Sequence, residues 1–598
     1  TFGSGGKVTT AIGSSGDTGY AVAIDDSDRI VVAGYSYNGT INFGRNANNP
    51  LDTGYAFSNA AYGVFNNYQE ATSRPDISIF IKSVEGFVQD SWKVHRRLTL
   101  ELGLRLANVI PQYEEQGRIS GFVLDRFDRS KMVQLIRPAV VDGRRSGVHP
   151  VTGQVYPQAL VGAIAPGSGN VANGLVTGTD SSYPRGLTRN PGLQFSPRFG
   201  FAWDVFGKGK TAVRGGFGMF TNLGDFQLLR LLGGQPPLVS TPQINFSTIR
   251  ELTSSPGFVF PQDIIGVDGR SLVPNVMNGS LSVQQSLGWG TVLDVGYVGS
   301  LGRHLLWQRN LSPIPLGANF LAQNADPTNP RVPLPPAFLR PLVGYNDVLL
   351  REWAASSNYH SLQMTVNRRF TRGLQMGGSW TWSKSMDYNS GDLTTVSPLV
   401  PVRVWNYGLS DFDRTHVVKI NYLYDLPAWK RNGVVSKQVF AGWQVSGITS
   451  FVSGAPTTAG FTLVNALDIT GTASQGARID VVADPVLPKA DRTFRRNFNT
   501  DAFRAPAVGT VGNSARYTMR GPGQNNFDIA ILKNFFIREP MRLQFRAELY
   551  NAFNHTQFSA FDNAARFDAQ GRQVNARFGE FTAARLPRQV QFALRFFF

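Results

Sequence analysis

The 598-residue sequence contains no cysteine. This absence excludes a disulfide scaffold, thiolate metal sites and a cysteine nucleophile. The sequence also has no run of about 18 apolar residues, which excludes a membrane-spanning helix. That second absence is compatible with a membrane β-barrel, because barrel strands alternate apolar and polar residues and give only a weak hydropathy signal.

Residues that bind metals are few and widely spaced. The six histidines are His95, His149, His304, His360, His416 and His555. No two of them have the spacing of a zinc motif, so each is better explained as a turn or surface residue. Asp25, Asp26 and Asp28 lack the glycine and the closing glutamate of a calcium loop, and a solvated hairpin turn explains them better. The sequence therefore predicts no metal site.

Catalytic motifs are also missing. Neither a nucleophile elbow (G-x-S-x-G), nor a Walker A loop, nor a zinc-protease motif occurs. Gly215, Gly216 and Gly218 form a partial glycine cluster, but they lie in a strand pattern and not between a strand and a helix. Glycines in such a position ease the curvature of a strand. We therefore expect no catalytic residue, no cofactor-binding residue and no cofactor, and a protein that is not an enzyme.

The charge is strongly basic, with 58 Lys and Arg against 41 Asp and Glu and a formal net charge of +17. A nucleic-acid-binding domain would concentrate this charge in a compact region. Here the basic residues are dispersed, which favours basic loops and a basic lumen in a surface protein that meets anionic lipid. We therefore predict no nucleic-acid partner.

The aromatic and turn-forming residues, by contrast, are abundant, with 42 Phe, 18 Tyr, 10 Trp, 63 Gly and 34 Pro. Many segments of about ten residues alternate apolar and polar side chains, a period that places the two kinds on opposite faces of a strand. Residues 98–106, 541–549 and 590–598 show this pattern most strictly. Strands of about 9–11 residues match a tilted crossing of a bilayer, whereas strands of soluble sandwiches are commonly shorter.

The connections between these segments alternate between short turns and long polar loops, which is typical of outer-membrane barrels. The short turns are His95–Arg97, Phe206–Lys210, Gly288–Gly290, Thr371–Gly373 and Arg538–Pro540, with a longer one at Ala428–Phe440. The pattern predicts fourteen antiparallel strands at residues 62–72, 77–94, 98–107, 196–205, 211–220, 279–287, 291–300, 361–370, 374–383, 416–426, 443–454, 527–536, 541–553 and 588–598. We thus expect an all-β transmembrane barrel with long external loops.

Trp92, Trp203, Trp380, Trp382, Tyr422 and Tyr424 lie on these segments. A ring with a polar edge is suited to the boundary between lipid and water, so these residues are candidates for the two aromatic belts of a barrel. Ordinary core aromatics are the alternative explanation.

Residues 1–40 differ from the rest. Ala21–Ile24 and Arg29–Gly34 predict a hairpin, and Phe2–Val8 and Ile30–Ser36 resemble one unit of the delta-60 repeat. The resemblance implies a propeller-type repeat, but it covers less than one unit, and a single blade cannot bury its own faces. We expect residues 1–40 to form a separate partial repeat outside the barrel wall. The sequence begins at Thr1 without a signal peptide, as a processed chain or a fragment would.

From residue 41 onward the sequence resembles a known family. The resemblance rests on Asn46–Tyr55, Phe87–Val94, Leu98–Arg105, Ser196–Asp204, Asp413–His416, Gly442–Ser446 and Glu548–Asn554. Together these segments resemble the Oar-like TonB-dependent receptors over residues 42–598. The resemblance implies an outer-membrane transporter with a plug and a barrel of about 22 strands. The sequence has no segment like a plug or a TonB box, so it resembles the C-terminal part of the barrel only, about 14 strands.

The resemblance also implies the location and the partners. It places the chain in the bacterial outer membrane, in contact with outer-membrane lipid, and makes TonB a partner by family only. Phe598 at the end of an alternating strand resembles the terminal aromatic that barrel-assembly machinery recognises. The sequence does not identify the ligand of the chain. The alternative is a secreted or surface β-rich binding or adhesion protein with a propeller-type repeat.

Overall fold

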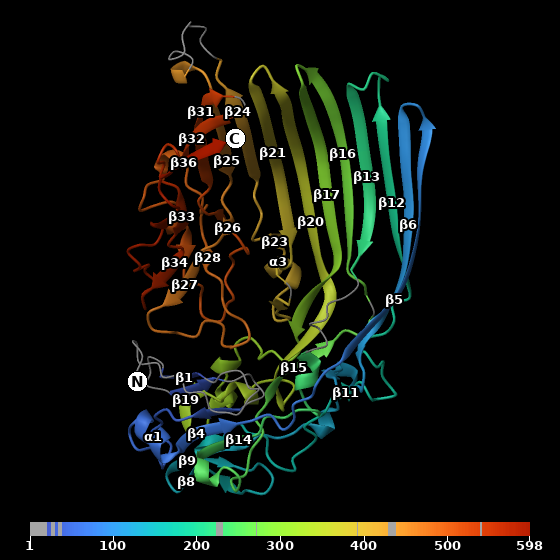
Figure 1. Ribbon diagram of the computed structural model, residues 1–598. Coiled ribbons are helices and arrows are strands. Elements are labelled where there is room, and N and C mark those ends of the chain that lie inside the picture. The colour runs from blue at the N-terminus through green and yellow to red at the C-terminus, as the bar shows by residue number, and fades with distance from the viewer. Residues whose placement is uncertain are drawn as a thin grey trace.

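One large antiparallel sheet dominates the computed structural model of the chain (Figure 1). The structure describes residues 21–24, 30–33, 39–222, 231–270, 272–391, 393–427, 438–538 and 541–598. The sheet contains 16 strands, of which β15 (Gln262–Val267), β22 (Thr395–Val396) and β23 (Gly408–Leu409) pair beside the main path. The predicted antiparallel all-β fold is therefore confirmed.

The main path of the sheet follows the order of the chain. Its strands are β5 (Ile79–His95), β6 (Leu98–Glu114), β12 (Leu193–Asp204), β13 (Thr211–Thr221), β16 (Asn275–Gly288), β17 (Thr291–Asn310), β20 (Tyr345–Thr371), β21 (Leu374–Asp387), β24 (His416–Asp425), β25 (Trp443–Val452), β31 (Gln524–Arg538), β32 (Met541–Tyr550) and β36 (Gln589–Phe597). Each overlaps one of the predicted segments. Thirteen of the fourteen predicted strands are thus confirmed.

The predicted short turns that the structure describes lie where the sequence placed them, whereas residues 539–540 and residues 428–437 of the longer connection fall outside the described residues. Trp289 and Gly290 join β16 to β17 with φ of 47° and 73°, and Arg372 and Gly373 join β20 to β21 with φ of 54° and 81°. Two consecutive residues with positive φ are the mark of a two-residue hairpin whose twist matches that of the strands. These turns lie at one end of the sheet, and the long connections lie at the other (Figure 1).

The prediction of a barrel strand at residues 62–72 is wrong. This segment contains the end of α1 (Ala56–Tyr62) and all of β4 (Val64–Gln69), which pairs with β3 (Thr40–Asn42) and β14 (Gln243–Thr248) in a separate sheet. The Asn66 side chain is buried, and its Nδ2 donates to the Gly44 carbonyl at 2.6 Å. A buried amide needs such fixed partners, which a lipid-facing strand could not offer.

The separate sheet continues into the N-terminal segment. β1 (Ala21–Ile24) and β2 (Ile30–Ala33) form an antiparallel hairpin, and β2 pairs with β3 through Val31 and Asn42. The predicted hairpin of the N-terminal segment is therefore confirmed for its two strands, whereas its turn at Asp25–Asp28 falls outside the described residues. Both strands therefore belong to this separate sheet and not to the main sheet (Figure 1).

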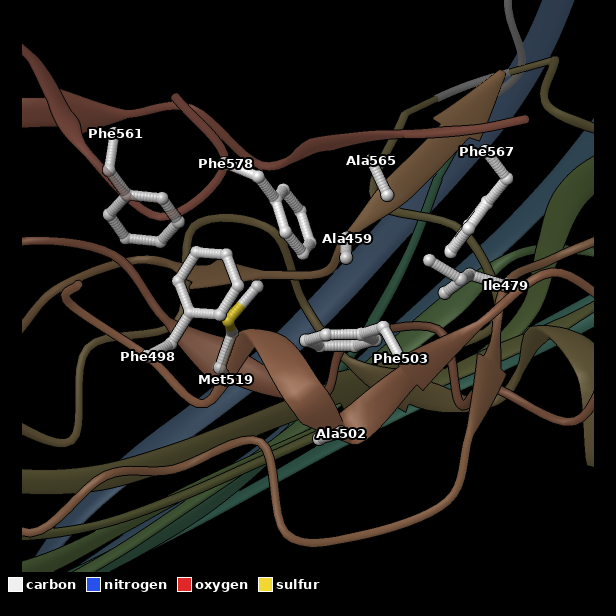
Figure 2. Close-up of a cluster of buried hydrophobic side chains, with 10 residues drawn as sticks. All are labelled: Ala459, Ile479, Phe498, Ala502, Phe503, Met519, Phe561, Ala565, Phe567 and Phe578. Atoms are coloured by element: carbon white, nitrogen blue, oxygen red, sulfur yellow. The ribbon is translucent and has the colours of Figure 1, made fainter. Parts of the chain in front are cut away.

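The long connections fold into a cap with several small cores. The largest core joins the β25–β31 connection (453–523) to the β32–β36 connection (551–588), and we call these two segments the aromatic module. β27 (Gly460–Leu463) and β34 (Ala564–Phe567) pair in parallel across it. Figure 2 shows its interior, where Phe498, Phe503, Phe561 and Phe578 face one another, all at most 9% exposed. The cap is therefore packed structure and not a set of loose loops.

The sheet is open in this structure. Every consecutive pairing along the main path is antiparallel, so the first and the thirteenth strand, β5 and β36, run in the same direction. In the described residues these two edge strands pair with β6 and β32 only. Direct closure of β5 on β36 would thus create one parallel pairing, which single-chain bacterial barrels with even strand numbers do not have.

Candidate functional site: the two faces of the sheet

The outer face of the sheet is apolar in successive rows across the strands. One row is defined by the pairings of Leu100 with Phe201, of Leu281 with Tyr297, and of Leu362 with Trp382. Leu281 is 51% exposed and Trp382 is 53% exposed. Apolar residues exposed over so many neighbouring strands form a patch that a monomer in water would not leave uncovered.

The next row, one residue further along each strand, is polar or small except at Val298. It runs through Glu101, Gly200, Gly216, Ser280, Val298, Ser361 and Ser383. Because side chains alternate across a strand, this row belongs to the opposite, inner face. The strict alternation predicted for residues 98–106 is thus confirmed, with Leu100, Leu102 and Leu104 on one face and Glu101 and Arg105 on the other.

All six predicted interface aromatics lie on the outer face, at two levels. Near the short turns, Trp203 pairs with Leu98 and Tyr424 pairs with Leu374, with Trp92 and Tyr422 two residues further along their strands. Toward the cap, Trp380 and Trp382 pair with Val418 and His416. Eight residues of β24 separate the two levels, roughly 27 Å along the strand. Their role as belts stays a prediction.

The last strand presents its apolar side outward as well. Phe592 stacks on Phe545 with ring centroids 5.9 Å apart, and Phe596 stacks on the C-terminal Phe598 at 6.0 Å. Phe598 is 91% exposed and lies just beyond β36. It is thus accessible to a partner at the short-turn end, and its role in assembly stays a prediction.

The inner face has hollows that sequence reasoning did not identify. The larger one, of ≈ 900 Å³, is lined by residues of β6, β12, β13 and β16, among them Arg198, Arg214 and Ser280. A second one, of ≈ 360 Å³, is lined by residues of β24, β25, β31 and β32, among them Asn421 and Asp528. The only signal in the sequence was the glycine cluster of β13, which the structure places in a strand, as predicted.

Among the described residues, no group of three or more His, Cys, Asp or Glu side chains could hold a metal ion. No helix in the described ranges is long and apolar enough to cross a membrane.

The cap is attached to the sheet by charged pairs. Arg516 of the β25–β31 connection bonds to Asp387 at the end of β21, and Arg520 bonds to Asp413 in the β21–β24 connection, each at 2.5 Å. Asp387 and Asp413 are both buried. Removing one partner from a buried pair leaves an uncompensated charge, so these contacts hold the aromatic module against the cap end of the sheet.

A third charged group, Glu352, lies on the extension of β20 beyond the two aromatic levels. Its carboxylate accepts the Trp307 Nε1 proton at 3.1 Å and the Arg309 Nε proton at 2.9 Å. Burial raises the pKa of Glu352, but these hydrogen bonds and the Arg309 charge lower it more, so the pKa lies below its ordinary value of 4.5. The ionised carboxylate therefore stabilises the cap.

We expect acid to loosen the cap at this point. Because the pKa of Glu352 is lower in the folded than in the unfolded chain, its stabilisation is complete above about pH 4.5 and is lost as the pH falls through the folded-state pKa. The urea midpoint of the cap, followed by near-UV circular dichroism at pH 7 and below pH 4, should fall with acid. Glu352→Gln should lower the midpoint at pH 7 and flatten this dependence; an equal slope in both proteins would contradict the assignment.

Comparison with known proteins agrees with the two-faced sheet. Residues 18–591 match the family model described as the outer membrane beta barrel domain, and no curated protein matches the chain. Similar solved structures include the outer membrane transporter YddB from Escherichia coli (8% identity, TM-score 0.38, 95% of this chain and 62% of that one). They also include the siderophore receptor PiuA from Acinetobacter baumannii (8%, 0.36, 87% and 44%) and the ferric citrate transporter FecA (9%, 0.36, 95% and 53%).

The chain thus spans less than two thirds of the length of each of these structures. The family model, in contrast, covers nearly all of the chain, including every strand of the main path except most of β36. An apolar outer face, a polar inner face and short turns opposite long connections are the features that this family requires. The chain belongs to the outer membrane β-barrel domain family and is a protein of the bacterial outer membrane.

Proposed function

We propose that the chain forms the wall of a receptor-type transporter of the TonB-dependent class, along whose inner face a solute crosses the outer membrane. The observation that carries this proposal is the division of the main sheet into an apolar outer face and a polar, hollowed inner face. A protein that only adhered to a partner would not need a largely polar face on the opposite side of the sheet.

The finer assignment draws on the family-like segments of the sequence. Phe87–Val94, Leu98–Arg105 and Ser196–Asp204 form parts of three consecutive strands, β5, β6 and β12. On this basis we propose that the chain is related to the Oar-like receptors. From their own sequence, we propose that residues 1–40 are a delta-60-type unit. Lipid would contact the outer face, and barrel-assembly machinery would bind the β36 end. TonB would act on the complete receptor, and loops of the cap would select the ligand.

Conductance in planar lipid bilayers tests the proposed passage. Protein refolded in detergent and added to a bilayer should produce stepwise, ohmic conductance, because the polar inner face lines one side of the passage and lipid headgroups line the gap between the two open edges. Asn421→Arg narrows the hollow of ≈ 360 Å³ and should lower the step size. A protein that is fully soluble without detergent and produces no conductance would overturn the proposal and favour the adhesion alternative.

If the outer face contacts lipid, a charged substitution there should lower the free energy of unfolding more than the same substitution on the inner face. Ile420 lies on the outer face of β24, midway between the levels of Tyr424 and His416. Ile420→Arg should destabilise the protein in lipid by about 2–4 kcal/mol, because it places a charge near the bilayer midplane. Asn421→Arg, one residue away on the inner face, should cost less than about 1 kcal/mol. Urea unfolding in phospholipid vesicles measures both, and equal costs would contradict the assigned faces.

A further inference from the structure

Two arginines stand on the inner face of the sheet without an acidic partner. Arg198 of β12 lies between Gly103 and Gly218 in the strand register, and Arg214 of β13 lies between Ala202 and Ser282. Both side chains are exposed to the hollow of ≈ 900 Å³. Within the part of the chain that the structure describes, neither guanidinium forms an ion pair, whereas Arg105 and Arg546 on the same face are paired with Glu85 and Glu548.

The space between the two arginines is kept open. Gly200 and Gly216 are paired with each other at the level between them. At Gly216, an added Cβ would have only the Phe199 carbonyl oxygen at 3.5 Å and the Ser280 Oγ at 4.0 Å near it. At Gly200, an added Cβ would lie 3.7 Å from the Glu101 Oε2. The floor therefore consists of backbone, small polar side chains and the Glu101 side chain. The arginines, about 14 Å apart by strand spacing, lie at opposite ends of it.

A neighbouring aromatic ring orients the charged group of Arg198. The Arg198 guanidinium lies 4.9 Å from the centre of the Phe220 ring, which orients it without neutralising it. Glu101, opposite Gly200, is the one carboxylate among the residues that line the hollow. Two positive charges and one negative charge leave the hollow with a net positive charge.

We propose that this patch is an oxyanion-binding station on the inner face, where Arg198 and Arg214 hold a carboxylate- or phosphate-bearing solute over the Gly200–Gly216 floor. The inference rests on the proposed passage, for which it names the substrate class. A guanidinium presents a planar fork of donors that matches the two oxygens of a carboxylate or a phosphate. The concave wall also concentrates anions above their bulk concentration.

Because the chain has no cysteine, a single introduced thiol can report on this station. Ser280→Cys, in the lining of the hollow, is labelled with an uncharged fluorophore in detergent, and its quenching by iodide is divided by its quenching by neutral acrylamide. Arg198→Gln with Arg214→Gln should lower this ratio at least about twofold. The double lysine variant, which keeps the charges, should not lower it. Inorganic phosphate at constant ionic strength should suppress iodide quenching more than chloride does.

A matched position controls for global changes. Ser379→Cys lies on the inner face of β21, several strands from the arginines, and its ratio should not respond to either arginine variant. An unchanged ratio at Ser280→Cys in the glutamine variant, or no advantage of phosphate over chloride, would overturn the station. This assay does not require a conducting pore, so failure of the proposed passage in bilayers would be a separate result.

Discussion

Replacing Phe503 by alanine is expected to lower the free energy of unfolding of the aromatic module by about 3–5 kcal/mol. The Phe503 side chain is 1% exposed, and its ring meets those of Phe498 and Phe578 edge to face, with centroids 5.8 Å and 5.9 Å apart. Truncation would remove both contacts and leave a cavity between the two connections, whose backbones meet in the parallel pair of β27 and β34. The loss should therefore separate the two halves of the module.

Hydrogen exchange resolved by segment measures this loss. In Phe503→Ala, residues 460–503 and 561–578 should exchange together and much faster than in the wild type, while β20 and β21 should be unaffected. Val508→Ala is the matched control, because Val508 lies in the same connection but is 53% exposed. If Phe503→Ala changed exchange no more than Val508→Ala, the two connections would not share a cooperative core.

The main sheet could be predicted from the sequence because its determinants are local. An alternation such as Leu98–Arg105 assigns each residue to a face without reference to any other segment, and a two-residue turn such as Trp289–Gly290 fixes which strand follows. Neighbours along the chain are also neighbours in the sheet. Thirteen strands were recognised for this reason, and the location of the six aromatics on one face followed from the same period.

The cap could not be predicted because its contacts are distant in sequence. β27 pairs in parallel with β34, about a hundred residues away. β4 pairs with β14, and no periodic pattern in the sequence indicates this pairing. The segment 62–72 was misassigned for the same reason, since the partners that satisfy Asn66 come from residues 44 and 49. The arginine station was missed because it becomes visible only when the register places Arg198 and Arg214 around Gly200 and Gly216.

The two edge strands of the sheet are expected to exchange their amide hydrogens fastest. We expect the backbone amides on the free sides of β5 and β36 to exchange at least roughly a hundredfold faster than those of β31 and β32, which are paired on both sides. Within the described residues, the edge strands have one neighbour each, and their outward amides have no ladder partner. In lipid, an unpaired amide costs several kcal/mol, so the edges are the least stable part of the wall.

Disulfide trapping distinguishes an open wall from a closed one. Val88→Cys on β5 and Phe592→Cys on β36 both face outward, and a bond between them requires Cα atoms within about 7 Å. We expect no intramolecular bond from this pair. Ala547→Cys with Phe592→Cys is the positive control, because these residues are directly paired between β32 and β36.

The direction of the strands is the reason why we expect no bond between β5 and β36. With thirteen antiparallel strands, β5 and β36 are parallel, and an antiparallel ladder on both edges needs an odd number of further strands between them. A second copy in the same membrane orientation would again offer only parallel edges. Rapid and complete trapping of Val88→Cys with Phe592→Cys, together with slow exchange on both edges, would therefore contradict this account. It would mean that the wall closes on itself with a single parallel pairing.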